Sequence, residues 1–239
     1  MENKKVSVFF CTRKIDDRTT TLIENFKNTA GMEIEVSPIE NPDAKPLTKV
    51  YNEVLSKESV KDKIVVFTHD DIEILSDKWA CHIERMFREH PEYGIIGVAG
   101  SAEFDENGAW WNYKIKFGQV LHRSEGKSWL TQFSPSYSHD LEQVCVIDGL
   151  FMAIEPDRIT KKFDEDLFGM QFYDISFCLD NFLDGKTKIG VTTKINLAHN
   201  SVGQLKPEWH ESRIRMIEKY GDKFPIIVKN QQKKKWQRK

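Results

Sequence analysis

The sequence predicts an α/β domain built around one largely parallel β-sheet. Short β-rich segments alternate with amphipathic segments through the first half of the chain, which is the pattern of consecutive βαβ units. The segment KIVVF at residues 63–67 is apolar on both faces, as a central parallel strand is. A length of 239 residues suits one domain with a buried core. We therefore expect a three-layer sandwich with helices on both faces of a mostly parallel sheet.

The elements of the first half follow from the hydrophobic period and from helix-breaking residues. VSVFFC at residues 6–11 predicts a first strand. Leu22, Ile23 and Phe26 recur at helical spacing and predict a helix over residues 19–28. Pro91 stops a later helix. The same criteria predict strands at residues 33–39, 63–67 and 94–99, and helices at residues 46–56 and 77–89.

The middle of the chain changes character. Residues 109–133 are rich in Trp, Tyr, Phe, Gly and Lys and predict a hairpin within a small mixed β insertion. A buried pattern then returns in QVCVIDGLFMAIEP, followed by the loop FDEDLFG, a helix over residues 172–183 and a strand at residues 188–193. We assign residues 1–228 to the domain and residues 229–239 to a basic, flexible tail.

The composition excludes several classes of protein. A formal net charge of −2 argues against a surface that binds nucleic acid, which needs a broad cationic footprint. The first apolar segment is too short for a signal-peptide core or a membrane span, so we expect a cytoplasmic chain. The cysteines form no CxxC pair, so neither a structural zinc site nor a redox motif is predicted. We expect free thiols at Cys11, Cys81, Cys145 and Cys178.

The first motif with chemical meaning is His69-Asp70-Asp71, directly after the KIVVF strand. There the chain leaves the carboxyl edge of the predicted sheet, where open α/β folds bind their ligands. Adjacent carboxylates repel each other, and a divalent cation that bridges a diphosphate supplies the compensating charge. Oxygen ligands with an imidazole suit Mg²⁺ or Mn²⁺ better than a soft metal. Simple capping of the following turn by Asp70 and Asp71 is the alternative explanation.

The segment VVFTHDDIEI resembles the DXD region of GT-A glycosyltransferases, especially the family-two-like enzymes of polysaccharide and lipopolysaccharide synthesis. His69 stands where these enzymes have the first Asp, and Asp71 stands at the last position of the motif. The resemblance implies a GT-A-like, Rossmann-like fold, a nucleotide-sugar donor, with a UDP-sugar favoured, and Mn²⁺ or Mg²⁺. It also implies that Asp71 binds the metal, with His69 as a further ligand, and that Asp70 and Asp71 contact the donor.

A second motif joins VIDGLFMAIEPDRI to KKFDEDLFGMQFYDISF and is similar to the acceptor region of inverting family-two-like enzymes. Asp174 occupies the position of their catalytic acidic residue, and Tyr173 stands where Glu is commoner. The resemblance implies that Asp174 is the general base, because inverting transfer needs a carboxylate to accept the proton of the attacking hydroxyl. Asp148 and Gly149 would contact the acceptor. A helix N-cap is the alternative role for Asp174, and the acidic residues at 164–166 are rival bases that fit a solvated turn.

Other positions also match the family. His199, in LAHNSVGQ, stands where several GT-A enzymes place a histidine on the metal. Cys11, Thr12 and Arg13 follow the first strand, where the fold receives the nucleotide, and Arg13 would contact a phosphate. Asn52 matches an Asn that faces the nucleotide. The alternatives are a structural His199, a solvated Arg13 and an Asn52 that is simply polar on its helix face.

Clustered aromatic residues and the basic tail complete the candidate features. Four aromatic residues either pack the insertion or form a platform for a sugar ring: Trp110, Trp111, Tyr113 and Trp129. The tail at residues 229–239 either is solvated or contacts an anionic membrane surface by charge.

The sequence therefore predicts an inverting, metal-dependent glycosyltransferase that moves a sugar to a glycan or lipid-linked acceptor in surface polysaccharide or lipopolysaccharide synthesis. A degenerate GT-A module that binds sugar without turnover is the alternative, because His69 and Tyr173 replace the usual acidic residues. A nucleotidyltransferase is disfavoured, because CTRKIDDRTT has no glycine for the triphosphate-binding loop of such enzymes.

Overall fold

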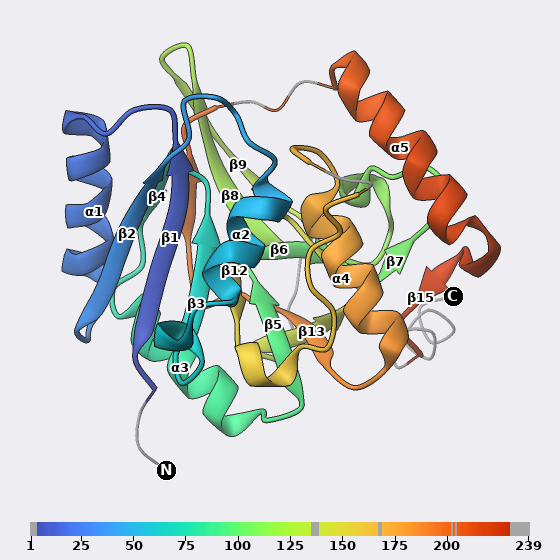
Figure 1. Cartoon of the computed structure of the whole chain (residues 1–239), viewed down its shortest axis with the longest axis horizontal. Helices are drawn as coiled ribbons and strands as arrows, with labels where there is room; N and C mark the ends of the chain where they lie inside the picture. Colours follow the sequence, from blue (N-terminus) through green and yellow to red (C-terminus); the bar gives the residue numbers. More distant parts are fainter. Residues whose placement is uncertain (1–3, 135–138, 167–168, 202, 204, 230–239) are drawn as a thin grey trace.

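A seven-stranded sheet forms the centre of the molecule (Figure 1). The computed structural model describes residues 4–134, 139–166, 169–201, 203 and 205–229. The strand order is β10-β13-β5-β12-β3-β1-β2. In chain order the strands are β1 (Val6–Thr12), β2 (Ile34–Glu40), β3 (Ile64–Thr68), β5 (Tyr93–Gly97), β10 (Leu141–Val144), β12 (Phe151–Ile154) and β13 (Lys188–Thr192).

The sheet is mostly parallel, with two exceptions. β1 pairs in parallel with β2 and β3, and β5 pairs in parallel with β13. β12 lies antiparallel between β3 and β5, and β10 lies antiparallel to β13 at the edge. The prediction of a largely parallel sheet is therefore confirmed only in part, because the segment after the insertion returns through the centre of the sheet in the opposite direction.

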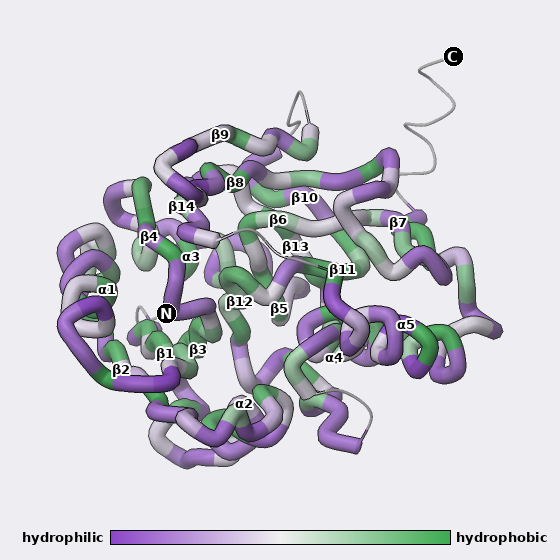
Figure 2. The backbone as a smooth tube through the Cα atoms, turned by 90° about the horizontal axis from the view of Figure 1, so that it is seen from above, coloured by the Kyte–Doolittle hydropathy of each residue, from purple (hydrophilic) through white to green (hydrophobic). Residues whose placement is uncertain are grey.

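Helices cover both faces of the sheet (Figures 1 and 2). On one face, the rings of Phe26 in α1 (Asp17–Thr29) and Trp79 in α3 (Trp79–Glu89) pack edge to face. On the other face, Tyr51 of α2 (Leu47–Leu55) stacks on Phe67 of β3, and α4 (Tyr173–Asp184) lies beside α2. These four helices match the predicted ones within two residues at each end. α5 (Pro207–Tyr220) was not predicted.

A second sheet lies beside the first and contains the predicted hairpin. Its order is β11-β6-β8-β14-β4, with β9 paired to β8. The predicted mixed β insertion contributes β8 and β9 to this sheet, in which β8 pairs in parallel with β14 and antiparallel with β6. The strands of this sheet are β4 (Ile72–Ile74), β6 (Ala99–Ser101), β8 (Lys116–Ser124), β9 (Lys127–Gln132), β11 (Val146–Ile147) and β14 (Leu197–His199). A further two-stranded sheet pairs β7 (Glu103–Phe104) with β15 (Ile226–Ile227).

All four cysteines are free thiols, as the sequence predicted. In the described part of the chain, none of the helices combines the length and the apolar character needed to cross a bilayer. The basic tail was predicted at residues 229–239, of which all but Lys229 lie outside the described residues.

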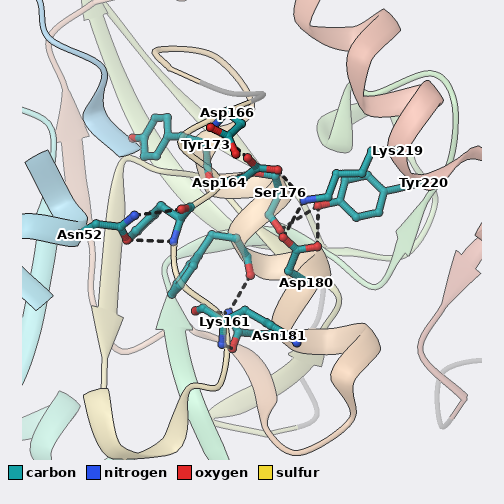
Figure 3. A network of polar contacts seen from close by, with 12 residues as sticks. Asn52, Lys161, Asp164, Asp166, Tyr173, Ser176, Asp180, Asn181, Lys219 and Tyr220 are labelled. Carbon is teal, nitrogen blue, oxygen red and sulfur yellow. Dashed lines mark hydrogen bonds and ion pairs between the residues drawn. The ribbon is translucent and has the colours of Figure 1, made fainter. Parts of the chain in front are cut away.

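A polar network attaches α5 to α4 and to the acidic loop before it (Figure 3). The Lys219 ammonium lies 2.7 Å from Asp164 Oδ2 and 2.8 Å from Asp180 Oδ2. The Tyr220 hydroxyl lies 2.9 Å from Asp180 Oδ1 and donates to the Ser176 carbonyl at 3.2 Å. Asp164, one of the three rival candidates for the general base, therefore forms an ion pair that stabilises the fold.

We expect Lys219→Met to destabilise the fold by about 1–3 kcal/mol, because two carboxylates lose the cation between them. Urea denaturation measures the change in the free energy of unfolding. Lys127→Met, at an exposed position on β9, is the control and should leave the free energy of unfolding within about 0.5 kcal/mol. Equal effects of the two substitutions would contradict the structural role of the network.

Candidate active site

A cluster of two histidines and one aspartate forms at the carboxyl edge of the central sheet. His69, Asp71 and His199 each offer a ligand atom within 4.8 Å of the other two. His199 Nε2 lies 3.3 Å from Asp71 Oδ2, and His69 Nδ1 lies 3.9 Å from Asp71 Oδ1. The other nitrogen of His69, Nε2, lies 3.3 Å from the Tyr173 hydroxyl. The cluster is accessible, since these side chains remain 14–35% exposed.

Strand pairing brings together residues that are far apart in the sequence. His69 and Asp71 lie between β3 and β4, where the chain passes from the first sheet to the second. β14 pairs antiparallel with β4, which places His199 opposite Ile72. The Asn200 N–H donates to the Asp71 carbonyl at 2.8 Å and continues this pairing. The position of His199 beside Asp71 is therefore set by the backbone.

The electrostatics of the cluster favour an ionised Asp71. Burial raises the pKa of this carboxyl, but hydrogen bonds from His199 and Ser201 and the proximity of His69 outweigh burial, so the pKa lies well below its ordinary value. Burial lowers the pKa of His199, yet the hydrogen bond to Asp71 leaves it raised. For His69, burial dominates and the pKa is lowered. A neutral His69 can offer a ring nitrogen to a metal.

The donor set of the cluster fits a divalent cation. Asp71 Oδ1 is enclosed and has no hydrogen-bond partner among the described residues. Buried polar atoms are normally paired, and an anionic oxygen beside imidazole groups is a suitable ligand for a cation. One carboxylate and two imidazoles suit a transition ion such as Mn²⁺ better than Mg²⁺, which prefers oxygen ligands.

A pocket of about 390 Å³ opens beside the cluster, at the carboxyl end of β1. Cys11, Thr12, Arg13 and Asp70 line it, so the structure brings together these four predicted nucleotide-contacting residues. Burial, followed by the charge of Asp70, raises the pKa of the Cys11 thiol to about 12, so it is protonated at neutral pH. The loop after β1 and the start of α1 contribute further basic groups to the pocket wall, Lys14 and Arg18 respectively.

Asn52 does not line this pocket. Its amide Nδ2 donates to the Phe163 carbonyl at 2.9 Å, and its Oδ1 accepts from the Phe163 N–H at 3.0 Å. Nδ2 also donates to Glu165 Oε1 at 2.6 Å. Asn52 therefore fastens the acidic loop to α2, and its predicted nucleotide contact stays a prediction. Glu165, another rival base, is engaged in the same contact.

The predicted base, Asp174, lies in the first turn of α4 against the Asp148-Gly149 segment. Asp174 Oδ2 accepts from the Gly149 N–H at 2.7 Å, and Oδ1 accepts from the Ile175 N–H at 2.9 Å. Burial, followed by the charge of Asp148, raises its pKa to about 7. The residue is not the N-cap of the helix, because Phe172 occupies that position. The carboxyl group of Asp174 is thus fixed in direction, and its pKa lies near neutral pH.

The packing around Gly149 leaves no room for a side chain. A Cβ at this position would lie 2.2 Å from the Tyr173 hydroxyl and 3.2 Å from Asp174 Oδ2. Tyr173, which stands where the family commonly has Glu, is buried and fills this space. The predicted acceptor contacts of Asp148 and Gly149 stay predictions, but both residues lie directly beside Asp174.

Two contacts near the site were not predicted from the sequence. Trp110, one of the four predicted aromatic candidates, is buried, and its indole N–H donates to Asp148 Oδ2 at 3.0 Å. His122 of β8 lies next to His199, with ring centroids 6.0 Å apart. The WWNYK segment does not indicate that Trp110 has a carboxylate partner far away in the sequence. A single histidine in a strand likewise does not indicate that His122 lies beside another histidine.

The fold is that of a GT-A-type protein, with a pocket and a His-Asp-His cluster that could hold a metal ion at one sheet edge. The chain belongs to the glycosyltransferase-like family, whose model matches residues 9–228. No curated protein matches it in sequence.

Among solved structures, 63 chains match. One is the structure of GalNAc-T7 with UDP, GalNAc and Mn²⁺. It has 10% sequence identity and a TM-score of 0.56, and the match covers 90% of this chain and 48% of that chain. Another is A197 from STIV, which has 14% sequence identity and a TM-score of 0.46, and the match covers 83% of this chain and 86% of that chain. The chain spans about half of the GalNAc-T7 chain, and this likeness shows the shared fold alone.

We expect Asn52→Ala to lower the free energy of unfolding by about 2–4 kcal/mol, because the buried backbone groups of Phe163 lose their partners. Chemical denaturation measures this loss, and Asn28→Ala at an exposed position of α1 is the matched control. Full stability with loss of nucleotide binding would instead support a direct nucleotide contact.

Proposed function

We propose that the protein is a divalent-metal-dependent, inverting glycosyltransferase that uses a nucleoside diphosphate sugar as donor. The observation that carries this proposal is the Asp71 carboxylate between two histidines, with an enclosed oxygen that lacks a hydrogen-bond partner among the described residues, beside a pocket at the carboxyl end of β1. Membership of the glycosyltransferase-like family supports the same activity. The nucleotide of the donor would occupy the pocket, with its diphosphate directed toward Asp71.

The residues of the donor site have separate tasks in this proposal. Asp71, His199 and His69 would hold Mn²⁺, which offsets negative charge on the diphosphate leaving group. Arg13 and the neighbouring basic groups of the pocket would contact phosphate oxygens by charge-assisted hydrogen bonds. Cys11 and Thr12 would border the base and ribose. The GalNAc-T7 structure contains UDP and Mn²⁺, which supports UDP as the first nucleotide to test.

Asp174 would accept the proton of the acceptor hydroxyl as its oxygen attacks the anomeric carbon. A base with a pKa near the working pH combines a populated ionised form with a strong drive for proton transfer. The Gly149 and Ile175 N–H groups aim the carboxylate and leave lone pairs free for the acceptor. Asp148, held by the Trp110 indole, would bind a sugar hydroxyl beside it.

The proposal extends to the acceptor and the pathway. We propose a glycan or lipid-linked acceptor in surface polysaccharide synthesis, with the Lys-rich tail at residues 229–239 near an anionic membrane surface. A sugar-binding module without turnover differs from this proposal in one respect: it binds a nucleotide sugar but releases no diphosphate.

Asp71→Asn should abolish metal-dependent nucleotide binding, because an amide has no charge to hold the cation. In a thermal-shift titration of UDP, GDP, CDP and TDP with Mn²⁺, one diphosphate should stabilise the wild type by about 2.7 kcal/mol at a hundred times its Kd. The matched control is Asp77→Asn, an exposed aspartate before α3, which should keep the shift. The donor-site proposal fails if no diphosphate shifts the wild type in the presence of metal.

Asp174→Asn should lower kcat by about 10²- to 10⁴-fold and leave the diphosphate thermal shift intact, because the variant loses only the base. In the wild type, kcat/KM should rise with pH through about 7 as Asp174 ionises. Activity assays with the nucleotide sugar chosen by thermal shift measure both. Wild-type turnover in Asp174→Asn, or activity that falls as pH rises through 7, would contradict this role.

The raised pKa also predicts a change in stability. The folded state binds a proton at Asp174 more tightly than the unfolded state does, so this stabilisation is complete below the ordinary carboxyl pKa and is lost as pH rises through about 7. Denaturation at pH 5 and pH 8 should therefore show Asp174→Asn becoming more stable relative to the wild type at the higher pH. An unchanged difference would show that the carboxyl is not tuned by burial.

A further inference from the structure

A continuous series of aromatic rings leads away from the metal cluster across the second sheet. The ring centroids of His69 and His199 are 5.8 Å apart, and those of His199 and His122 are 6.0 Å apart. His122 in turn stacks on Trp129, with centroids 5.5 Å apart and ring planes 21° from parallel. Strand register produces this series, because β14 places His199 opposite His122 and β8 places His122 opposite Trp129.

Trp129 differs from the other large rings near the site in its exposure. It is 41% exposed, whereas Trp79, Trp110 and Trp209 are at most 9% exposed. It belongs to β9, which lies at the outer edge of the molecule above β8 (Figure 2). The stacking of His122 against one side holds the indole in place, so an exposed flat apolar surface is already ordered before any ligand binds.

His122 carries a second sign of a ligand. Its Nδ1 is enclosed and lacks a hydrogen-bond partner among the described residues, as Asp71 Oδ1 does. Such atoms are normally paired in folded proteins. The His122 side chain as a whole is only half-buried, so a turn of its ring can bring this nitrogen to a sugar hydroxyl, and a neutral imidazole nitrogen either donates or accepts.

We propose that Trp129 and His122 form a carbohydrate-binding subsite for a sugar ring of the acceptor. The apolar C–H face of a pyranose complements the electron-rich face of an indole, and its hydroxyls complement His122. This inference rests on the proposed function and adds the class of acceptor, a glycan of at least two sugar units. Three imidazoles, those of His122, His199 and His69, separate Trp129 from Tyr173, so the stacked sugar is not the one that carries the attacking hydroxyl.

The surroundings favour a sugar over a nucleobase as the stacked group. A base also stacks on aromatic side chains, but a pocket lined by Asp70 and by the residues that follow β1 is available for it. The donor nucleotide is accommodated there, and β4, β14 and β8 lie between that pocket and β9.

Saturation-transfer NMR with maltotriose, cellotriose and chitotriose in metal-free buffer tests the subsite. At least one trisaccharide should receive saturation at the protons of one pyranose face. Trp129→Ala should weaken its binding by at least about tenfold, as truncating a tryptophan anchor does, and Trp129→Phe should largely retain it. Leu130→Ala is the matched control, because Leu130 is the next residue on the same strand, points to the opposite face and is 58% exposed.

The outcomes separate this inference from the proposed donor site. The subsite is contradicted if none of the trisaccharides binds the wild type, if UDP receives the saturation from Trp129 instead, or if Trp129→Ala and Leu130→Ala behave alike. Trp129→Ala should also keep the Mn²⁺-dependent diphosphate shift. Trisaccharide binding that depends on Trp129, in a protein that binds no diphosphate, would support the subsite and overturn the donor proposal.

Discussion

The pairing of β14 between β4 and β8 is the constraint on which the candidate site depends. It joins the segment after β3 to a segment more than a hundred residues later and places His199 beside Asp71. The same strand positions His122 and, through β8 and β9, Trp129. The His69-Asp71-His199 cluster and the series of aromatic rings therefore both follow from the register of β14 with β4 and β8. A slip by one residue would turn these side chains to the opposite face of the sheet.

The edge of the sheet concentrates carboxyl groups that differ in their physical state. The histidine neighbours of Asp71 keep its pKa low, so this carboxyl is ionised. Burial and the charge of Asp148 instead raise the pKa of Asp174 to about 7. This difference suits the two tasks that we propose, because a carboxyl group binds a metal in its ionised form and a general base must exchange a proton near the working pH. Backbone N–H groups fix Asp174 and Leu150 N–H fixes Asp148, so neither carboxyl depends on a mobile side chain for its direction.

The sequence predicted the features that depend on local pattern. Apolar strands, amphipathic helices and Asp71 at a strand end follow from periods of two and 3.6 residues and from the position of polar groups after KIVVF. Features set by long-range contacts were missed. α5 has few buried positions, chiefly Trp209, Met216 and Tyr220, so its pattern is weak. The role of Asn52 depends on Phe163, and the burial of Trp110 depends on Asp148, neither of which is near in sequence. Family resemblance, not periodicity, pointed to His199 and Asp174.

We propose that His69, Asp71 and His199 hold one divalent cation together with the donor diphosphate. Pulsed electron paramagnetic resonance of Mn²⁺ bound to the protein in the presence of UDP tests this proposal most directly. We expect nitrogen couplings from coordinated imidazoles together with phosphorus couplings from the diphosphate, and fewer nitrogen couplings in His199→Gln. A spectrum of fully hydrated Mn²⁺, without nitrogen or phosphorus couplings, would contradict the metal site and the donor geometry built on it.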